Sequence, residues 1–287
     1  MHLFVQEVES GVGLAAVYAL LAVSLTFTYR ATGIVQLAQG DVMTCGAFAA
    51  YFVSQATHNF LAALLVGAAA SSAVGFVAYM VVFRRLLNSG HLPPLVAGLA
   101  LAAIIQESLR IAFFNGQSSP FPRFAWVSGL APGSQNFLII GIALVAGIAF
   151  ELLLRLTKAG REVRATADNI EVARLLGINA GRRQLFAFVL AAGLAGIAGV
   201  LLALVYGSIS FDRGASLEFV AVACVLLGGL GNILGALIGA VVLGLGNSLI
   251  STYVSSGYVN GLVFLIVLLV IILRPSGLLG HEIGSRA

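Results

Sequence analysis

Three polar side chains, Gln36, Gln39 and Asp41, lie close together at the start of an apolar run that follows Arg30. Their chemistry suits a zwitterionic solute, because an amide donates or accepts hydrogen bonds and a carboxylate meets an ammonium group. Polar groups at membrane depth are costly unless they face a cavity or a partner, so they predict a solute path beside a helix break at Gly40. The structural alternative is that Asp41 caps the onward helix.

Gln106 and Glu107 lie deep in another apolar run, residues 92–114. They are further candidates for the same path. An equally simple interpretation is that they pair with Arg110, one helical turn further on.

The chain lacks the sequence signatures of an enzyme. Its single lysine, Lys158, is followed by Ala159 and cannot complete a phosphate-binding loop, and no nucleophile-elbow motif is present. Both cysteines lie inside apolar runs, where they are expected to act as small core residues. The histidines lie at the edges of apolar runs and have no metal-ligand spacing: His2, His58, His91 and His281. We therefore expect a non-catalytic protein with no cofactor and no metal.

A polar stretch from Arg164 onward has the marks of a short capped helix. Asp168 is the expected N-cap, with Glu171 three residues on in capping-box spacing. Gly177 stands where a left-handed residue would end the helix. A helix this short is unstable alone, so its apolar face must dock on this protein or on a partner. The expected face consists of Ile170, Ala173 and Leu176, broadened by Val172 and Leu175.

Composition indicates what surrounds these residues. Hydrophobic residues make up 60% of the chain and charged residues only 9%, against about 25% in soluble domains. Continuous apolar runs long enough to cross a bilayer predict an all-α polytopic membrane protein of eight or nine spans. The runs cover residues 11–29, 34–53, 60–83, 92–114, 137–154, 185–206, 217–230, 233–250 and 261–273. The seventh and eighth are two spans joined by a tight turn, or one broken helix.

The placement of basic residues predicts the orientation. With the N-terminus outside and nine spans, twelve of the fifteen basic residues fall on the cytoplasmic side, and the C-terminus is cytoplasmic as well. Residues 155–184 then form a cytoplasmic loop with seven of these residues, and residues 115–136 an extracytoplasmic loop. The net charge of +4 comes mostly from that cytoplasmic loop, which points to membrane anchoring or docking and not to nucleic acid. Residues 1–287 are expected to form one transmembrane domain.

Small residues recur at helical spacing near the seventh and eighth runs. Gly231, Gly235 and Gly239 fall four apart, and Gly228 and Gly229 precede them. Such a stripe lets helices approach closely in lipid. The pattern favours packing within the chain over a seam between subunits.

Four motifs, in order along nearly the whole chain, resemble the LivH-type permease subunits of the branched-chain amino acid ABC importers. The first is Ala38-Gln39-Gly40, although Gln36, Leu37 and Asp41 replace the usual Asn, Phe and Glu. The second is the cytoplasmic segment, which matches at Arg164, Ala165, Ala167, Ala173, Gly177, Ile178 and Asn179. The third is the glycine-rich stretch from Gly228 to Gly239, and the fourth is Arg274-Pro275-Ser276-Gly277.

This resemblance implies a permease subunit of the bacterial inner membrane that moves amino acids, branched-chain ones first. The segment around Arg164, Ala167, Asp168, Glu171, Ala173, Leu176 and Gly177 would be the coupling helix that binds a cytoplasmic ABC ATPase. A second homologous permease and an extracytoplasmic substrate-binding protein are the other implied partners, with lipid around the chain. Urea, amides or other amino acids are alternative substrates in this family. A stand-alone secondary transporter is the alternative from another class, with only Asp41 and Glu107 to couple an ion gradient.

Overall fold

The computed structural model describes residues 2–87, 89–90, 92–113, 116–122 and 134–253, with ten further positions between 261 and 279. Most of the loop 115–136, including Trp126, and most of the predicted span 261–273 lie outside the described residues. The elements are α1 (His2–Thr32), α2 (Gln39–Thr57), α3 (Phe60–Ala78), η1 (Tyr79–Phe83), α4 (Arg84–Leu86), α5 (Leu92–Ala112), β1 (Ser119–Pro120), α7 (Ser134–Leu156), α8 (Lys158–Asp168), α9 (Ile170–Leu175), α10 (Ala180–Tyr206), β2 (Ser208–Ile209), α11 (Arg213–Gly228) and α12 (Ile233–Tyr253).

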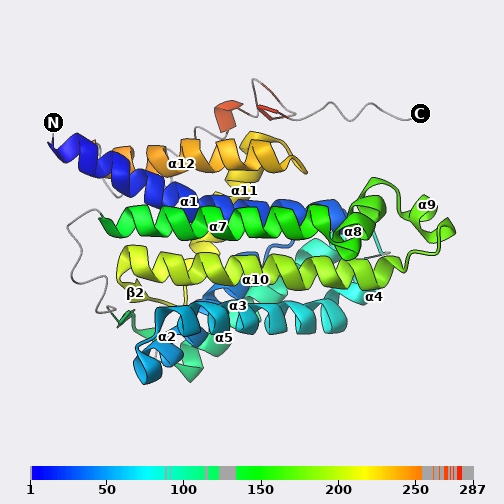
Figure 1. Ribbon diagram of the computed structural model, residues 1–287, viewed down its shortest axis with the longest axis horizontal. Helices are drawn as coiled ribbons and strands as arrows, with labels where there is room; N and C mark the ends of the chain where they lie inside the picture. The colour runs from blue at the N-terminus through cyan, green and yellow to red at the C-terminus, as the bar shows by residue number, and fades with distance from the viewer. Residues whose placement is uncertain are drawn as a thin grey trace.

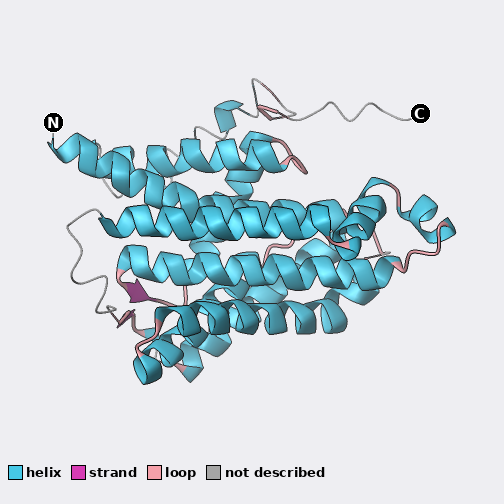
Figure 2. Ribbon diagram, in the orientation of Figure 1, coloured by secondary structure: helices cyan, strands magenta, loops and turns pink. Residues whose placement is uncertain are grey.

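The described chain is a bundle of long helices with one short pair of antiparallel strands, β1 and β2 (Figures 1 and 2). Helices α4, α8 and α9 lie at one end of the bundle and β2 at the other (Figure 1). We name these the α8–α9 end and the sheet end. Within the described residues, six helices are long and apolar enough to cross a membrane: α1, α3 continued through α4, α5, α7, α10 and α12. The polytopic helical membrane fold is therefore confirmed.

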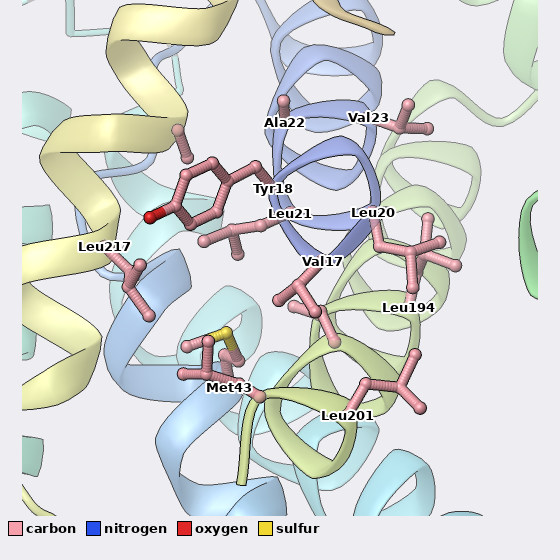
Figure 3. Packing of buried hydrophobic residues seen from close by; sticks show 14 of the residues in the cluster. Val17, Tyr18, Leu20, Leu21, Ala22, Val23, Met43, Leu194, Leu201 and Leu217 are labelled. Atoms are coloured by element: carbon pink, nitrogen blue, oxygen red, sulfur yellow. The ribbon is translucent and has the colours of Figure 1, made fainter. Parts of the chain in front are cut away.

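Helices α1 and α10 form the centre of the bundle. In α1, 83% of the most apolar window is buried inside the chain, and in α10 the share is 78%, whereas α3, α5 and α7 bury 28% or less. Side chains of α1 and α10, such as Leu21 and Leu201, pack with Met43 of α2 and Leu217 of α11 (Figure 3). The outer helices leave their apolar faces exposed, as expected for surfaces that meet lipid.

Helices α11 and α12 are two separate helices joined by a tight turn, which decides between the two alternatives left open by the sequence. The turn contains Gly229 and Gly231, both with positive φ, at 102° and 82°. A side chain at Gly235 would overlap the backbone of Gly228, and one at Gly239 would overlap the backbone of Cys224. These close approaches lie within one chain. The prediction that Gly231 lies on the helical stripe is wrong, because the helix begins only at Ile233.

The start of α2 differs from the predicted span in a way that bears on the candidate site. The apolar run was expected to be helical from residue 34, but α2 begins at Gln39. Gly33 ends α1 with a φ of 73°, and its N–H donates to the carbonyl of Tyr29. Residues 34–38 therefore form a non-helical connection between two helices. This connection carries Gln36, and the first turn of α2 carries Gln39 and Asp41.

Candidate functional site

The break between α1 and α2 lies well inside the bundle. The side-chain amide of Gln39 donates to the hydroxyl of Ser24 at 3.2 Å. Ser24 is eight residues before the end of α1, which corresponds to about 12 Å at 1.5 Å per residue. Because a bilayer core is about 30 Å thick, α2 begins at membrane depth. Short or interrupted helices at such a depth are where transporters place polar binding groups.

The break gathers buried polar side chains. Gln36, Gln39 and Asp41 are each only 1% exposed, and Glu218 of α11 joins them at 4% exposure. The Glu218 carboxylate accepts a hydrogen bond from the backbone N–H of Gly40. Several side-chain atoms of this group have no hydrogen-bond partner among the described residues: Gln36 Nε2 and Oε1, Gln39 Oε1, Asp41 Oδ1 and Glu218 Oε1. Such groups are costly to bury alone, so the break is a polar centre within an apolar bundle.

Sequence reasoning missed Glu218, although a signal was present. Glu218 is the only charged residue between Arg213 and Arg274, and it lies in the apolar run of residues 217–230. A lone acid at membrane depth is itself a candidate functional group. The same signal had been used for Asp41, but nothing in the sequence places the two residues together, since Gly40 and Glu218 are 178 positions apart.

The polar centre is closed in this conformation. A side chain at Gly40 would overlap the backbone of Gly214, and one at Gly214 would overlap the hydroxyl of Thr44. The neighbouring cavity, lined by residues that include Met43, Thr44, Ser208 and Arg213, has a volume of about 10 Å³, enough for at most one water molecule.

The other two predicted pathway residues, Gln106 and Glu107, lie on the outer helix α5. Glu107 forms an ion pair with Arg110 at 2.5 Å, and both side chains are about half exposed. This is the pairing expected as the alternative to a pathway role. Gln106 is half-buried. Glu107 and Arg110 therefore contribute to the outer surface of α5 near its end, where long side chains reach the membrane interface.

At the α8–α9 end, the predicted single helix is two helices joined at Asn169. The predicted N-cap, Asp168, is instead the last residue of α8, and the cap of α9 is Asn169. Its Oδ1 accepts from the N–H groups of Glu171 at 3.0 Å and Val172 at 3.1 Å. Gly177 ends the helix with a φ of 78°, as predicted.

The apolar residues of α9 divide between two surfaces. Ala173 is 1% exposed and packs inward, and Ile170 is half-buried. Val172, Leu175 and Leu176 are 49%, 87% and 72% exposed. Ala173, and in part Ile170, therefore dock on this protein, which is one of the two predicted alternatives, whereas Leu176 does not. Exposed leucines at the tip of a polar loop are unusual unless a partner covers them.

Helix α8 fixes this tip to the bundle. The guanidinium of Arg164 donates to the carbonyl of Leu154 at 2.7 Å, at the end of α7. Glu162 pairs with Arg183 of α10 at 2.5 Å. Arg164 thus anchors the loop, and Ala167 is half-buried beside it.

The chain was compared with known proteins. Residues 8–273 match the family described as "Branched-chain amino acid transport system / permease component". The chain belongs to this family. It is 31% identical to the high-affinity branched-chain amino acid transport system permease protein LivH of Escherichia coli K12, over 97% of this chain and 96% of LivH. It is also 33% identical to the autoinducer 2 import system permease protein LsrC of Salmonella paratyphi B, over 50% of this chain and 45% of LsrC.

Among solved structures, a chain of the PsaBC complex from Streptococcus pneumoniae with a Fab has a TM-score of 0.49 and 10% identity, over 93% of this chain and 91% of that chain. As a member of the permease family, this chain is an inner-membrane permease subunit and one component of a transport system.

Proposed function

We propose that this permease carries amino acids inward for an ABC importer, with branched-chain amino acids as the first candidates and ATP hydrolysis on a separate subunit. LivH, the relative matched over nearly its whole length, supports that substrate class. LsrC is named for autoinducer 2, so permeases of related sequence serve different solutes. Urea, amides and other amino acids are the alternative substrates, and a binding protein outside the membrane would select among them.

The proposed orientation places the α8–α9 end in the cytoplasm. Basic residues of several elements gather there: Arg84 and Arg85 are in α4, and Arg155 ends α7. Arg30 lies beside Gly231 in the α11–α12 turn. An excess of basic residues marks the cytoplasmic side of a membrane protein. The N-terminus of α1 and the two strands then lie outside.

Contacts near the C-terminus support nine spans over eight. Ser248, near the end of α12, donates to the carbonyl of Glu7 at 2.8 Å, which places it beside the start of α1. The N–H of Leu278 donates to the carbonyl of Leu227 at 2.8 Å, at the opposite end of the bundle. Ser248 and Leu278 therefore lie at opposite ends of the bundle. A ninth crossing places the C-terminus in the cytoplasm.

The observation that carries the proposed coupling is the exposed apolar surface of α9. Leu175 and Leu176 are 87% and 72% exposed among the described residues, on a loop that α8 attaches to the bundle. Such a surface suits a cleft in a cytoplasmic ATPase subunit, and α8 would transmit the motion of that subunit to α7 and α10. A second, homologous permease is the proposed partner within the membrane.

The solute path is proposed to pass the α1–α2 break. Gln36, Gln39 and Asp41 supply donors and acceptors for a zwitterion, and Gly40 allows the backbone of α2 to meet α11. The half-buried Gln106 of α5 is proposed to contribute at the outer part of the path. The polar centre lies at membrane depth, where a solute needs polar groups to replace its hydrogen bonds with water.

A co-purification experiment tests the coupling surface. The double variant Leu175→Ser and Leu176→Ser removes both exposed leucines. Burying one leucine contributes about 1.5–3 kcal/mol, so we expect at least a ten-fold loss of affinity for the proposed ATPase partner. Leu156→Ser is the matched control, since Leu156 is 71% exposed at the end of α7. Equal ATPase recovery with the double variant and with the control would contradict the docking role.

A further inference from the structure

Helix α2 begins inside the bundle without a cap from its own sequence. Its N-cap residue is Ala38, whose side chain accepts no hydrogen bond. The first backbone bond of the helix runs from the N–H of Val42 to the carbonyl of Ala38 at 3.0 Å. The N–H of Gly40 therefore has no acceptor within α2. At membrane depth such a donor needs a partner from elsewhere in the protein.

Helix α11 supplies that partner. The Glu218 carboxylate accepts from the Gly40 N–H and is buried with it. Gly214 lies four residues earlier, hence on the same face of α11. A side chain on Gly214 would overlap the carbonyl of Gly40, so only a bare backbone lets α11 come close enough. The pair Gly214 and Glu218 thus forms a seat for the first turn of α2.

We propose that Glu218 is a positioning residue: its side-chain oxygen holds the start of α2, and with it Gln36, Gln39 and Asp41, in place beside the proposed path. This inference rests on the proposed path through the α1–α2 break. Glu218 acts through the backbone of Gly40 and does not itself need to touch the solute.

The hydrogen bond requires an acceptor oxygen and not a negative charge. Among the described residues, neither Asp41 nor Glu218 forms an ion pair with a basic side chain. Two neighbouring carboxylates without a cation repel each other and are costly to bury. A glutamine at position 218 keeps an acceptor oxygen and removes that repulsion. Glu218→Gln should therefore keep the hydrogen bond to Gly40, whereas Glu218→Leu, with a side chain of similar size, should lose it.

The test uses the complete importer, purified with the proposed ATPase, second permease and binding-protein partners. Three variants are compared with wild type: Glu218→Gln, Glu218→Leu and Gly214→Ala. The first readout is hydrogen–deuterium exchange of the backbone over residues 39–44, with residues 50–57 at the other end of α2 as the internal control. The second readout is uptake of radiolabelled leucine into proteoliposomes, measured as kcat and KM.

We expect Glu218→Leu and Gly214→Ala to increase exchange at residues 39–44 by about ten-fold or more and to leave residues 50–57 unchanged. Both should lower the kcat for leucine uptake by about ten-fold, while Glu218→Gln stays within two-fold of wild type in both readouts. If Glu218→Leu fails to assemble, Gly214→Ala provides the test. In that variant the Glu218 carboxyl group is intact, but the new methyl group keeps α11 too far from Gly40 for the hydrogen bond.

Two results would overturn the inference. Unchanged exchange at residues 39–44 in Glu218→Leu would show that the carboxyl group does not hold α2. A Glu218→Gln variant as impaired as Glu218→Leu would show that the charge matters and not the acceptor oxygen. If wild type takes up no leucine, the proposed substrate fails, but the exchange readout still decides whether Glu218 holds α2.

Discussion

The contact between α11 and α12 gives a stability prediction whose size follows from the structure. In Gly235→Ala, the new methyl group would overlap the carbonyl of Gly228 and lie 3.0 Å from its Cα. Ordinary carbon contacts are about 3.5–4.0 Å, and backbone atoms cannot swing aside as a flexible side chain does. Overpacking of this kind costs about 1–3 kcal/mol.

A control on the same helix separates packing from helix propensity. Gly246 has no atom within 4 Å of the position that its Cβ would take. Replacing a helical glycine by alanine without a clash stabilises by up to about 1 kcal/mol. Gly246→Ala should therefore be as stable as wild type or more so. The difference between the two alanine variants then measures the cost of the clash.

The buried thiol of Cys224 provides the assay, because a thiol-reactive fluorophore labels it only on unfolding. The assay uses a Cys45→Ser background, because Cys45 is only partly buried and would also react with the fluorophore. Scaling of about 2–4 °C per kcal/mol for chains of 150–250 residues predicts that Gly235→Ala unfolds about 2–12 °C below Gly246→Ala. The temperatures are apparent ones, compared at a single heating rate. If both variants unfold within 1 °C of each other, the close packing of α11 on α12 is wrong.

Three further predictions concern the loop and the break. Asn169→Ala should weaken ATPase co-purification, because α9 loses about 0.5–2 kcal/mol of capping, while Asp168→Ala should leave recovery unchanged. The opposite result would show that Asp168, the cap expected from the sequence, is the N-cap. Gly177→Ala places a side chain at a φ of 78° and should also lower ATPase recovery, whereas Gly177→Asn should be less affected because asparagine tolerates this backbone angle better. Equal recovery of the two variants would show that backbone strain at this position does not matter. Asp41→Leu should lower leucine uptake by at least ten-fold with unchanged ATPase recovery, and normal uptake would remove Asp41 from the path.

The membrane fold and the loop helix could be predicted because their signals are local. Continuous apolar runs locate the spans, and Gly177 ends a helix through a backbone angle that few other residues adopt. Errors arose where a neighbouring residue offered the same chemistry. Asp168 and Asn169 both suit an N-cap, and the length of α8 decides between them, since the N–H of Asn169 still bonds to the carbonyl of Ala165.

The polar centre could be predicted only in part. Gln36, Gln39 and Asp41 stand out in an apolar run, and the structure brings them to one break in the chain. Their partner Glu218 comes from a helix far along the sequence, and only tertiary packing brings it to Gly40. Hydropathy likewise cannot show that residues 34–38 leave the helix, because their side chains remain largely apolar. The sequence also cannot show which face of α9 is exposed, because that depends on which face packs against the bundle.

Transport by the reconstituted protein tests the central claim most directly. This chain is placed in liposomes alone, and in parallel with its ATPase, permease and binding-protein partners. Uptake of radiolabelled leucine is followed with ATP or with an imposed ion gradient. The account predicts uptake only by the complete system and only with ATP. Leucine uptake by this chain alone, driven by an ion gradient, would contradict it and show a self-sufficient secondary transporter.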